Sequence, residues 1–204
     1  MSRTAWARRD TLPADQEPLI LRPSDHVHDL AEVRLIRAAR LGNAESFGAL
    51  WDAEVDRLFS VACVLVADAE ALLLVSEAFG RLSARLGQLS LQQPFREQAA
   101  AALLTVTLAR LRPPRLQSIL PAPGPLSRGG VPPGAPRAGG DPAARVEAVV
   151  RSASVPLRLI WAFSTLGGLK ARHLAVIVGE PEPLVREARS LMQYRIMAAM
   201  QGDL

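Results

Sequence analysis

The sequence predicts an all-α protein of two small helical domains joined by a linker rich in proline and glycine. From Leu30 to Arg112, and again beyond residue 144, apolar residues recur every three or four positions, the period of an amphipathic helix. No segment shows the alternation of a half-buried strand. Nine of the sixteen prolines and six of the fourteen glycines fall between Pro113 and Pro142, which favours a linker over a packed core there.

These features divide the chain into four parts. Residues 1–29 are expected to form a flexible N-terminal tail, 30–112 the first helical domain, 113–143 a disordered linker and 144–204 the second helical domain. At about 3 Å per residue in extended form, such a linker would let the domains separate by up to about 90 Å. The sequence leaves open whether the domains dock face to face.

Local end signals place the first helices. Gly42 is expected to end a short helix, and Asn43 stands where its side chain can cap the next one. The apolar positions from Phe47 to Val66 keep one face through about five turns. This stretch is therefore predicted to be a single long helix.

Two further helices complete the first domain. The third is expected to have Asp68 as its N-cap, to end near Gly87 and to place Leu72, Val75, Phe79 and Leu82 on its apolar face. The fourth should run from about Pro94 to Arg112, where two prolines stop it. In the second domain, Gly179 ends one helix and Pro183 opens the next, so the last two helices form a helix-turn-helix.

Charge is unevenly distributed along the chain. The formal net charge is +4, and residues 31–112 carry nine basic and nine acidic side chains, whereas residues 144–204 carry eight against five. This modest excess is compatible with weak nucleic-acid binding by the second domain. The single cysteine, Cys63, excludes an internal disulfide, and its apolar neighbours predict a buried, unreactive thiol.

Signals for membranes, metals and catalysis are weak. The longest apolar runs reach about half the length of a membrane-crossing helix, and the N-terminus lacks the apolar core of a signal peptide, so we expect a cytoplasmic protein without membrane insertion. His26 and His28 have no further ligand nearby, and His173 is expected at the surface or near a phosphate. No nucleophile has a base and an orienting group close in sequence. We expect no enzymatic activity, no metal and no cofactor.

Three stretches resemble the extracytoplasmic-function (ECF) group of bacterial RNA polymerase sigma factors. The stretches RAARLGNAESFGALWDAEVDRLF and DAEALLLVSEAFGRL look like sigma region 2, and LKARHLAVIVGEPEPLVREAR looks like region 4, the promoter-reading helix-turn-helix. With the linker between them they span about Leu30 to Met200. The resemblance implies core RNA polymerase and promoter DNA as partners, and an anti-sigma factor as a further one.

On the third predicted helix, the resemblance implies a polymerase-binding face. The residues that it assigns to binding polymerase or another partner are Glu70, Leu73, Glu77 and Arg81. The chain departs from the family at Leu72 and Leu73, which stand where the family carries acids. Leu72 is expected in the core and Leu73 partly exposed, either as ordinary apolar surface or as an altered partner surface.

On the fourth predicted helix, the family carries a Trp-Leu pair, a basic residue and an Asn that capture the melted strand. Gln98, Ala99, Ala101 and Thr105 stand at these positions. Alanines supply neither aromatic platforms nor hydrogen-bond donors for an unstacked base. Promoter melting by this helix is therefore in doubt, and a helix built for packing is favoured.

The helix-turn-helix supplies the predicted DNA contacts, namely Lys170, Arg172, Arg186, Arg189 and Arg195. Its second helix also begins among the acids Glu180, Glu182 and Glu187. Carboxylates stabilise a helix start through its dipole but repel the DNA backbone. We therefore expect promoter binding that is weak or altered.

Three functions remain open. The first is a divergent sigma factor that directs transcription initiation. The second is a sigma mimic or decoy that has lost promoter melting and binds an anti-sigma factor or another protein. The third is a helical structural or scaffold module, which the low aromatic content permits; a lone monomer in native extract would count against it.

Overall fold

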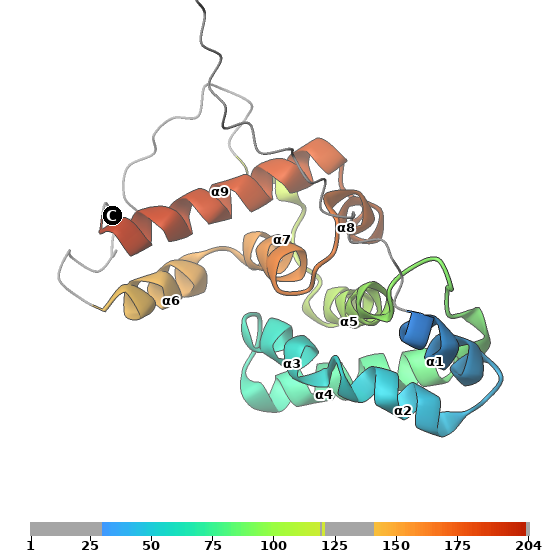
Figure 1. The fold of residues 1–204 in the computed structure, drawn as a ribbon. Coiled ribbons are helices and arrows are strands. Elements are labelled where there is room, and N and C mark those ends of the chain that lie inside the picture. The colour runs from blue at the N-terminus through green and yellow to red at the C-terminus, as the bar shows by residue number, and fades with distance from the viewer. Residues whose placement is uncertain (1–29, 119, 121–140, 203–204) are drawn as a thin grey trace, which may run out of the picture.

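The computed structural model describes residues 30–118, 120 and 141–202, and all regular structure within them is helical (Figure 1). The predicted fold class is confirmed, because these residues form α-helices and short 3-10 turns and no strand. The expected N-terminal tail lies outside the described residues, and so does most of the expected linker. No helix in the described part combines the length and the apolar content needed to cross a membrane.

The N-terminal half contains five α-helices and a short turn. They are α1 (Leu30–Arg40), α2 (Ala44–Asp52), α3 (Val55–Cys63), α4 (Asp68–Ser83), the 3-10 turn η1 (Leu86–Gln88) and α5 (Phe95–Leu111). Helix α4 packs along α5, and α1 packs along α2. The Phe47 ring contacts those of Phe79 and Phe95, at centroid distances of 5.2 and 6.1 Å.

The helix ends predicted at Gly42, at Asn43 and before the two prolines that follow Arg112 are confirmed. Gly42 has a φ of +91°, which glycine adopts without strain, directly after α1. The Asn43 side chain accepts a hydrogen bond of 2.8 Å from the Ser46 N–H at the start of α2. Arg112 ends α5 in the left-handed conformation, just before the two prolines.

The prediction of one helix from Phe47 to Val66 is wrong. The chain breaks at Ala53 and Glu54, where the Glu54 N–H turns back to the Trp51 carbonyl at 2.9 Å. Trp51 and Leu58, one on each side of the break, are both buried. The apolar pattern continues because α2 and α3 face the same core, and pattern alone does not reveal the turn.

The expected boundaries of the third helix also need correction. Asp68 is the first residue of α4, Ala67 stands at the N-cap position, and no side chain caps this end. The helix ends at Ser83, earlier than predicted, and Gly87 lies in the following 3-10 turn η1. Asp68 instead hydrogen-bonds the Cys63 thiol.

The Cys63 thiol is only half-buried, so the prediction of a buried cysteine is wrong. Partial burial, with the hydrogen bond and the charge of Asp68 adding to it, raises the pKa of the Cys63 thiol above its ordinary value. The thiol therefore stays protonated at neutral pH, where the reactive form is the thiolate.

The C-terminal half contains four helices: α6 (Pro142–Ser152), α7 (Val155–Thr165), α8 (Ala171–Val178) and α9 (Glu182–Gln201). Asp141 caps α6 through the Ala143 N–H at 3.1 Å, so this half begins slightly before the predicted boundary at residue 144. Helix α9 packs against α6, α7 and α8. Arg145 donates to the Ala199 carbonyl at 2.7 Å and thereby ties α6 to the end of α9.

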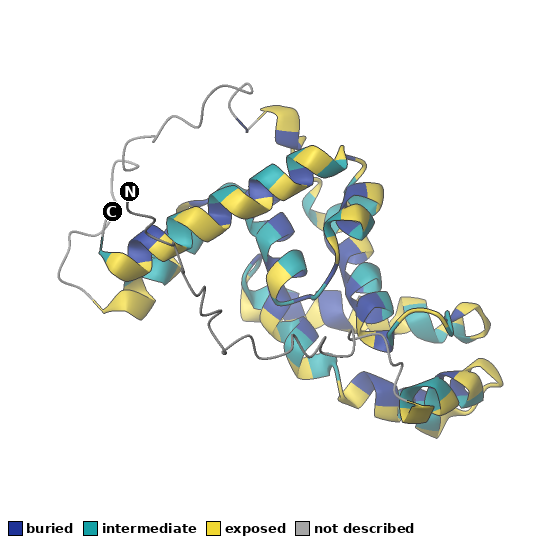
Figure 2. Ribbon diagram, turned by 45° about the horizontal axis from the view of Figure 1, so that its top comes forward, coloured by how far each residue is buried: buried dark blue, intermediate teal, exposed yellow. Residues whose placement is uncertain are grey.

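The two halves are packed together rather than held apart. Their buried side chains form one continuous cluster from Ile36 to Met192. Helix α5 lies at the junction, with α3 and α4 on one side and α7 and α8 on the other (Figure 1). Figure 2 shows buried positions along the inner sides of the helices where the halves meet. The described structure is thus a closed arrangement with a joint core.

The beginning of the expected linker is ordered, which corrects the prediction for these residues. Leu116 is buried within the short turn η2 (Leu116–Ser118), which contacts α9, and Leu120 is buried as well. The Leu116 N–H donates a hydrogen bond to the Glu180 carboxylate at 3.0 Å. Residues 121–140 lie outside the described part.

Candidate functional site

The helix-turn-helix is formed by α8, a glycine turn and α9. Gly179 has a φ of +74° and ends α8, as predicted, while the Gly179 and Glu180 N–H groups both return to the Ala175 carbonyl. Buried Leu174 on α8 and buried Val185 on α9 lie on the inner sides of the two helices. The turn therefore holds the start of α9 in a fixed direction.

The three acids at the start of α9 have different surroundings. Glu180 is buried, and its carboxylate accepts from the Leu116 N–H, so it is not presented to DNA as the sequence led us to expect. Glu182 accepts from Arg186 Nε at 2.9 Å, one turn further along the same helix. Glu187 is half-buried. Repulsion of a DNA backbone at this helix end is therefore weaker than the three acids imply.

The predicted DNA-binding residues do not form a single patch. Arg186 and Arg189 are exposed on the first two turns of α9, the Arg186 side chain at 71%. Arg195 is half-buried and lies about 180° around the helix from Arg186. Lys170 and Arg172 stand at the N-terminal end of α8.

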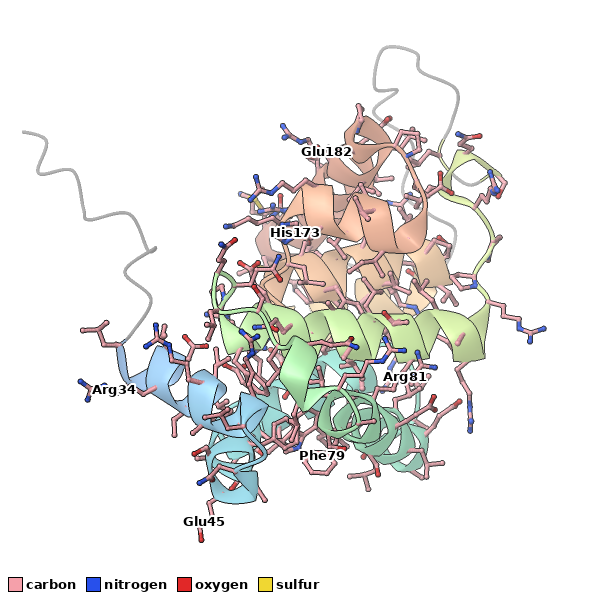
Figure 3. All side chains as sticks on the ribbon, turned by 90° about the vertical axis from the view of Figure 1, so that its right-hand side faces the viewer. Arg34, Glu45, Phe79, Arg81, His173 and Glu182 are labelled. Atoms are coloured by element: carbon pink, nitrogen blue, oxygen red, sulfur yellow. The ribbon has the colours of Figure 1, made fainter. Side chains whose placement is uncertain are left out.

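Lys170 and His173 are engaged with the other half of the molecule. The Glu97 carboxylate of α5 is almost buried and lies 3.7 Å from Lys170 Nζ and 3.2 Å from His173 Nδ1. Arg172 is exposed, and its Nε lies 3.3 Å from His173 Nε2. Figure 3 shows His173 on the side of the C-terminal half that faces α5. Lys170 thus belongs to the junction between the halves in this arrangement.

A second polar contact across the junction comes from Arg57 on α3. Its guanidinium donates to the carbonyls of Leu166 and Gly167 at 3.0 and 2.7 Å, and to the Arg96 carbonyl at 3.1 Å. Glu54 accepts from Arg57 Nε at 2.6 Å and holds the side chain in place. Carbonyls at a helix end lack helical partners, so Arg57 caps α7 from the other half.

The Gly-Gly turn after α7 depends on its glycines. A Cβ at Gly167 would lie 2.6 Å from the Phe163 carbonyl oxygen, and Gly168 has a φ of +72° beside the Arg96 guanidinium. The sequence showed the two glycines but not Arg57 or Glu97, because contacts over such sequence separations leave no local pattern.

The predicted partner-binding residues lie along one stripe of α4. Glu70, Leu73, Glu77 and Arg81 follow one another at helical spacing. Glu70 lies 3.5 Å from Arg110 of α5, and Glu77 lies 3.4 Å from Arg81. Leu73 is 59% exposed, as expected. The stripe is therefore accessible, and Figure 3 shows Arg81 on the lower half of the molecule.

Leu72 is not in the core, which contradicts the prediction. It is 61% exposed, whereas the buried face of α4 consists of Ala71, Leu74, Val75 and Ala78. Phe79 is also partly exposed, although its ring lies 5.1 Å from that of Trp51. The buried face of α4 thus consists of two alanines beside Leu74 and Val75, and the positions of the large apolar residues alone do not locate it.

The residues of α5 that stand at the family's strand-capturing positions serve the fold. The Gln98 side-chain amide donates to the carbonyls of Ser90 and Gln93, and its oxygen accepts from the Ser90 N–H at 2.7 Å. Ala99 is fully buried. The Thr105 hydroxyl donates to the Ala101 carbonyl of the previous turn. Gln98 and Ala99 are thus engaged within the protein, in keeping with a packing helix, whereas Thr105 is exposed and bonds only its own helix.

No group of three or more His, Cys, Asp or Glu side chains suited to a metal ion occurs among the described residues. His26 and His28 lie outside them. An open apolar groove of about 660 Å³ is formed by α3 and by the C-terminal half. Its lining includes Cys63, Val146, Trp161 and Met200.

Comparison with known proteins gives a likeness of fold. No family model matches the sequence, and no curated protein matches it. A solved structure of CnrH in complex with the cytosolic domain of CnrY superposes with a TM-score of 0.57 and 16% sequence identity, over 85% of this chain and 99% of that one. CnrH is an ECF sigma factor, so the chain has a divergent fold similar to that of an ECF sigma factor.

Proposed function

We propose that the protein is a non-enzymatic, sigma-like transcription regulator that binds core RNA polymerase and promoter DNA in the cytoplasm. The observation that carries the proposal is the likeness of fold to CnrH, which covers 85% of this chain and therefore extends well beyond the helix-turn-helix. Small helix-turn-helix units recur in many proteins, whereas two unlike helical units in a fixed order are a more specific feature.

The surfaces of the two halves support a division of roles. The exposed stripe of α4, with Glu70, Leu73 and Glu77, is the proposed contact with polymerase. Arg186 and Arg189 on α9 are the proposed contacts with DNA, because both are exposed near the start of the second helix of the helix-turn-helix. Two such arginines fit weak, salt-sensitive binding.

Co-purification with core polymerase tests the proposal, followed by run-off transcription on genomic fragments. We expect association at low salt, and Leu73→Asp changes its strength by about tenfold because it alters the centre of the α4 stripe. Leu41→Asp is the matched control, since Leu41 is 90% exposed at the end of α1. Failure to associate with core polymerase at low salt would reject this function.

A second candidate is a sigma mimic that occupies an anti-sigma factor or another sigma-binding protein. It is favoured by α5, where the Gln98 side chain is bonded to the loop at Ser90 and Gln93 and where neither Gln98 nor Thr105 supplies an aromatic platform for an unstacked base. The CnrH structure contains the cytosolic domain of CnrY, which supports a protein partner of this kind. The apolar groove beside Cys63 and Trp161 is a further surface that a partner could cover.

Transcription from a supercoiled template separates the two candidates. The double variant Ala101→Arg, Thr105→Asn adds the basic residue and the amide found in the family, and it leaves Gln98 and its loop contacts intact. If the native protein forms open complexes, the mimic is excluded. If neither protein does so while a Leu73→Asp change abolishes binding of a protein partner, the mimic is favoured.

A further inference from the structure

The covalent connection between the two halves is much shorter than the composition of the chain indicates. Helix α5 ends at Leu111, and Arg112 is followed by two prolines that cannot extend the helix. Leu116 is then 1% exposed, in contact with the C-terminal half. Only four residue steps separate Arg112 from this anchored leucine. We refer to residues 113–118 as the strap.

The strap is anchored by Leu116 and by a hydrogen bond to Glu180, and Leu120 just beyond it is buried as well. Leu116 is buried, and its N–H donates to the Glu180 carboxylate at 3.0 Å. Glu180 is itself 8% exposed, and its own N–H is held by the Ala175 carbonyl in the turn after α8. A buried carboxylate is stable only when it is hydrogen-bonded. The anchor is therefore part of the turn of the helix-turn-helix.

The strap prolines are not closely packed against the helices beneath them. A partly open pocket of about 310 Å³ lies there, lined by strap prolines and by apolar side chains that include Leu108, Pro156, Ile160 and Ile177. The strap is thus held mainly by Leu116 and Glu180, and its release would leave the helices of both halves intact.

We propose that the strap is a releasable lock that sets how far the two halves can separate. While Leu116 is anchored, four residues limit the separation of the end of α5 from the C-terminal half to about 14 Å. Once it is released, the connection runs from Arg112 to Pro142, and thirty residues reach about 100 Å when extended. The lock therefore decides whether the halves can contact two DNA sites more than one helical turn apart. This consequence for DNA rests on the proposed function, whereas the lock itself does not.

Insertion of a flexible segment at two positions tests the lock. Fluorescence energy transfer is measured between labels at Glu45→Cys and Gln193→Cys, both exposed, in a Cys63→Ser background. The urea concentration is chosen so that closed and open forms are both populated. Six Gly and Ser residues are inserted either after Pro114, within the four-residue tether, or after Gly130. Both insertions leave Leu116 and Glu180 unchanged.

The two insertions have different expected effects. Lengthening a tether from four to ten residues shifts the closed-to-open ratio about fourfold towards the open form, because the closure entropy scales with the logarithm of length. The insertion after Gly130 lies outside the tether and leaves the ratio unchanged. If the strap is not anchored, both insertions lengthen the same thirty-residue linker and shift the ratio equally, by about 1.3-fold. Equal shifts would overturn the proposal.

A second variant tests the anchor directly. Glu180→Ala removes the acceptor of the Leu116 N–H, so hydrogen exchange at the Leu116 amide accelerates at least tenfold and the open form gains population. Gln117→Ala is the control, because Gln117 is exposed within the same turn. Equal exchange in the two variants would contradict the lock. If Glu180→Ala fails to fold, the paired insertions still decide, and neither measurement depends on whether core polymerase binds.

Discussion

Helices α5 and α9 are the longest helices of the N-terminal and C-terminal halves in the described part, and they are built in opposite ways. Helix α5 buries eight of its seventeen residues, and α9 buries five of its twenty. The former lies between the halves, whereas the latter runs along the outside of the C-terminal half (Figures 1 and 2). A larger share of α9 is therefore open to a partner, whereas neighbouring helices of both halves cover much of α5.

The contrast follows from the residues of each helix. Helix α5 carries AAAA in its centre, and small side chains let it approach neighbours on more than one side while favouring the helix itself. Glu97 is its nearly buried charge, and it faces Lys170 and His173. On α9, Arg186 and Arg189 face solvent, and the buried Val185 and Ala188 form the inner side.

The largest expected effect is a difference in the free energy of unfolding between variants of α5 and variants of α9. Leu103 on α5 is fully buried, so Leu103→Ala should lower the free energy of unfolding by about 2–5 kcal/mol through lost contacts and a new cavity. Met197 on α9 is 58% exposed, and Met197→Ala should change it by less than about 0.5 kcal/mol. Urea denaturation followed by circular dichroism measures both. Similar losses would show that α9 is covered in solution.

A somewhat smaller effect is expected at the junction that α5 shares with the C-terminal half. Arg57→Ala leaves the carbonyls of Leu166 and Gly167 without their donor and should cost about 1–3 kcal/mol. Arg57→Lys keeps the charge but loses the forked geometry, so it should recover only part of that loss. Arg81→Ala, which removes an exposed pair with Glu77, is the control and should cost less than about 1 kcal/mol.

Thermal unfolding of these three variants provides the measurement. A cost at Arg57 no greater than that at Arg81 would mean that the halves are apart in solution. The closed arrangement would then not be the resting state of the protein.

DNA binding sharpens the comparison further. Arg186→Ala and Arg189→Ala should each weaken binding to duplex DNA by about 1 kcal/mol and lower the salt slope of the binding constant by about one unit. Thr105→Ala on α5 and Arg34→Ala on α1 should leave binding unchanged. The Thr105 hydroxyl is bonded within its own helix, and Arg34 lies on α1, away from the helix-turn-helix. Fluorescence anisotropy at several salt concentrations tests all four. Loss of DNA binding in the Thr105 variant would indicate that α5 contacts DNA.

Features that depend on residues close in sequence could be predicted, whereas features that depend on distant contacts could not. Gly42, Asn43 and Gly179 were assigned correctly because caps and left-handed turns depend on neighbouring residues. The break at Glu54 and the exposure of Leu72 were missed because the helix period does not say which neighbour a face will meet.

The functional residues that were missed all act across the junction. Arg57 bonds carbonyls more than one hundred positions away, and Glu97 and Glu180 each find partners more than sixty positions away. The proline and glycine content that predicted a linker is real, but one leucine within it was enough to anchor its start. Composition describes an average over a segment, whereas an anchor needs a single side chain.

The smallest effect concerns Glu182, where folding and binding should respond with opposite signs. Its carboxylate stands in the first turn of α9 and pairs with Arg186, which stabilises the helix by about 0.5–1 kcal/mol. Glu182→Gln should lose this stability, yet it removes a negative charge beside the DNA and frees Arg186. DNA affinity should therefore rise about two- to fivefold at low salt, and the gain should vanish as salt screens the charges. The control is Glu45→Gln, an acid in the first turn of α2 far from α9. A fall in DNA affinity in the Glu182 variant would mean that the Glu182–Arg186 pair positions the arginine for DNA. The contribution of α9 to binding would then depend on this ion pair and not on its positive charge alone.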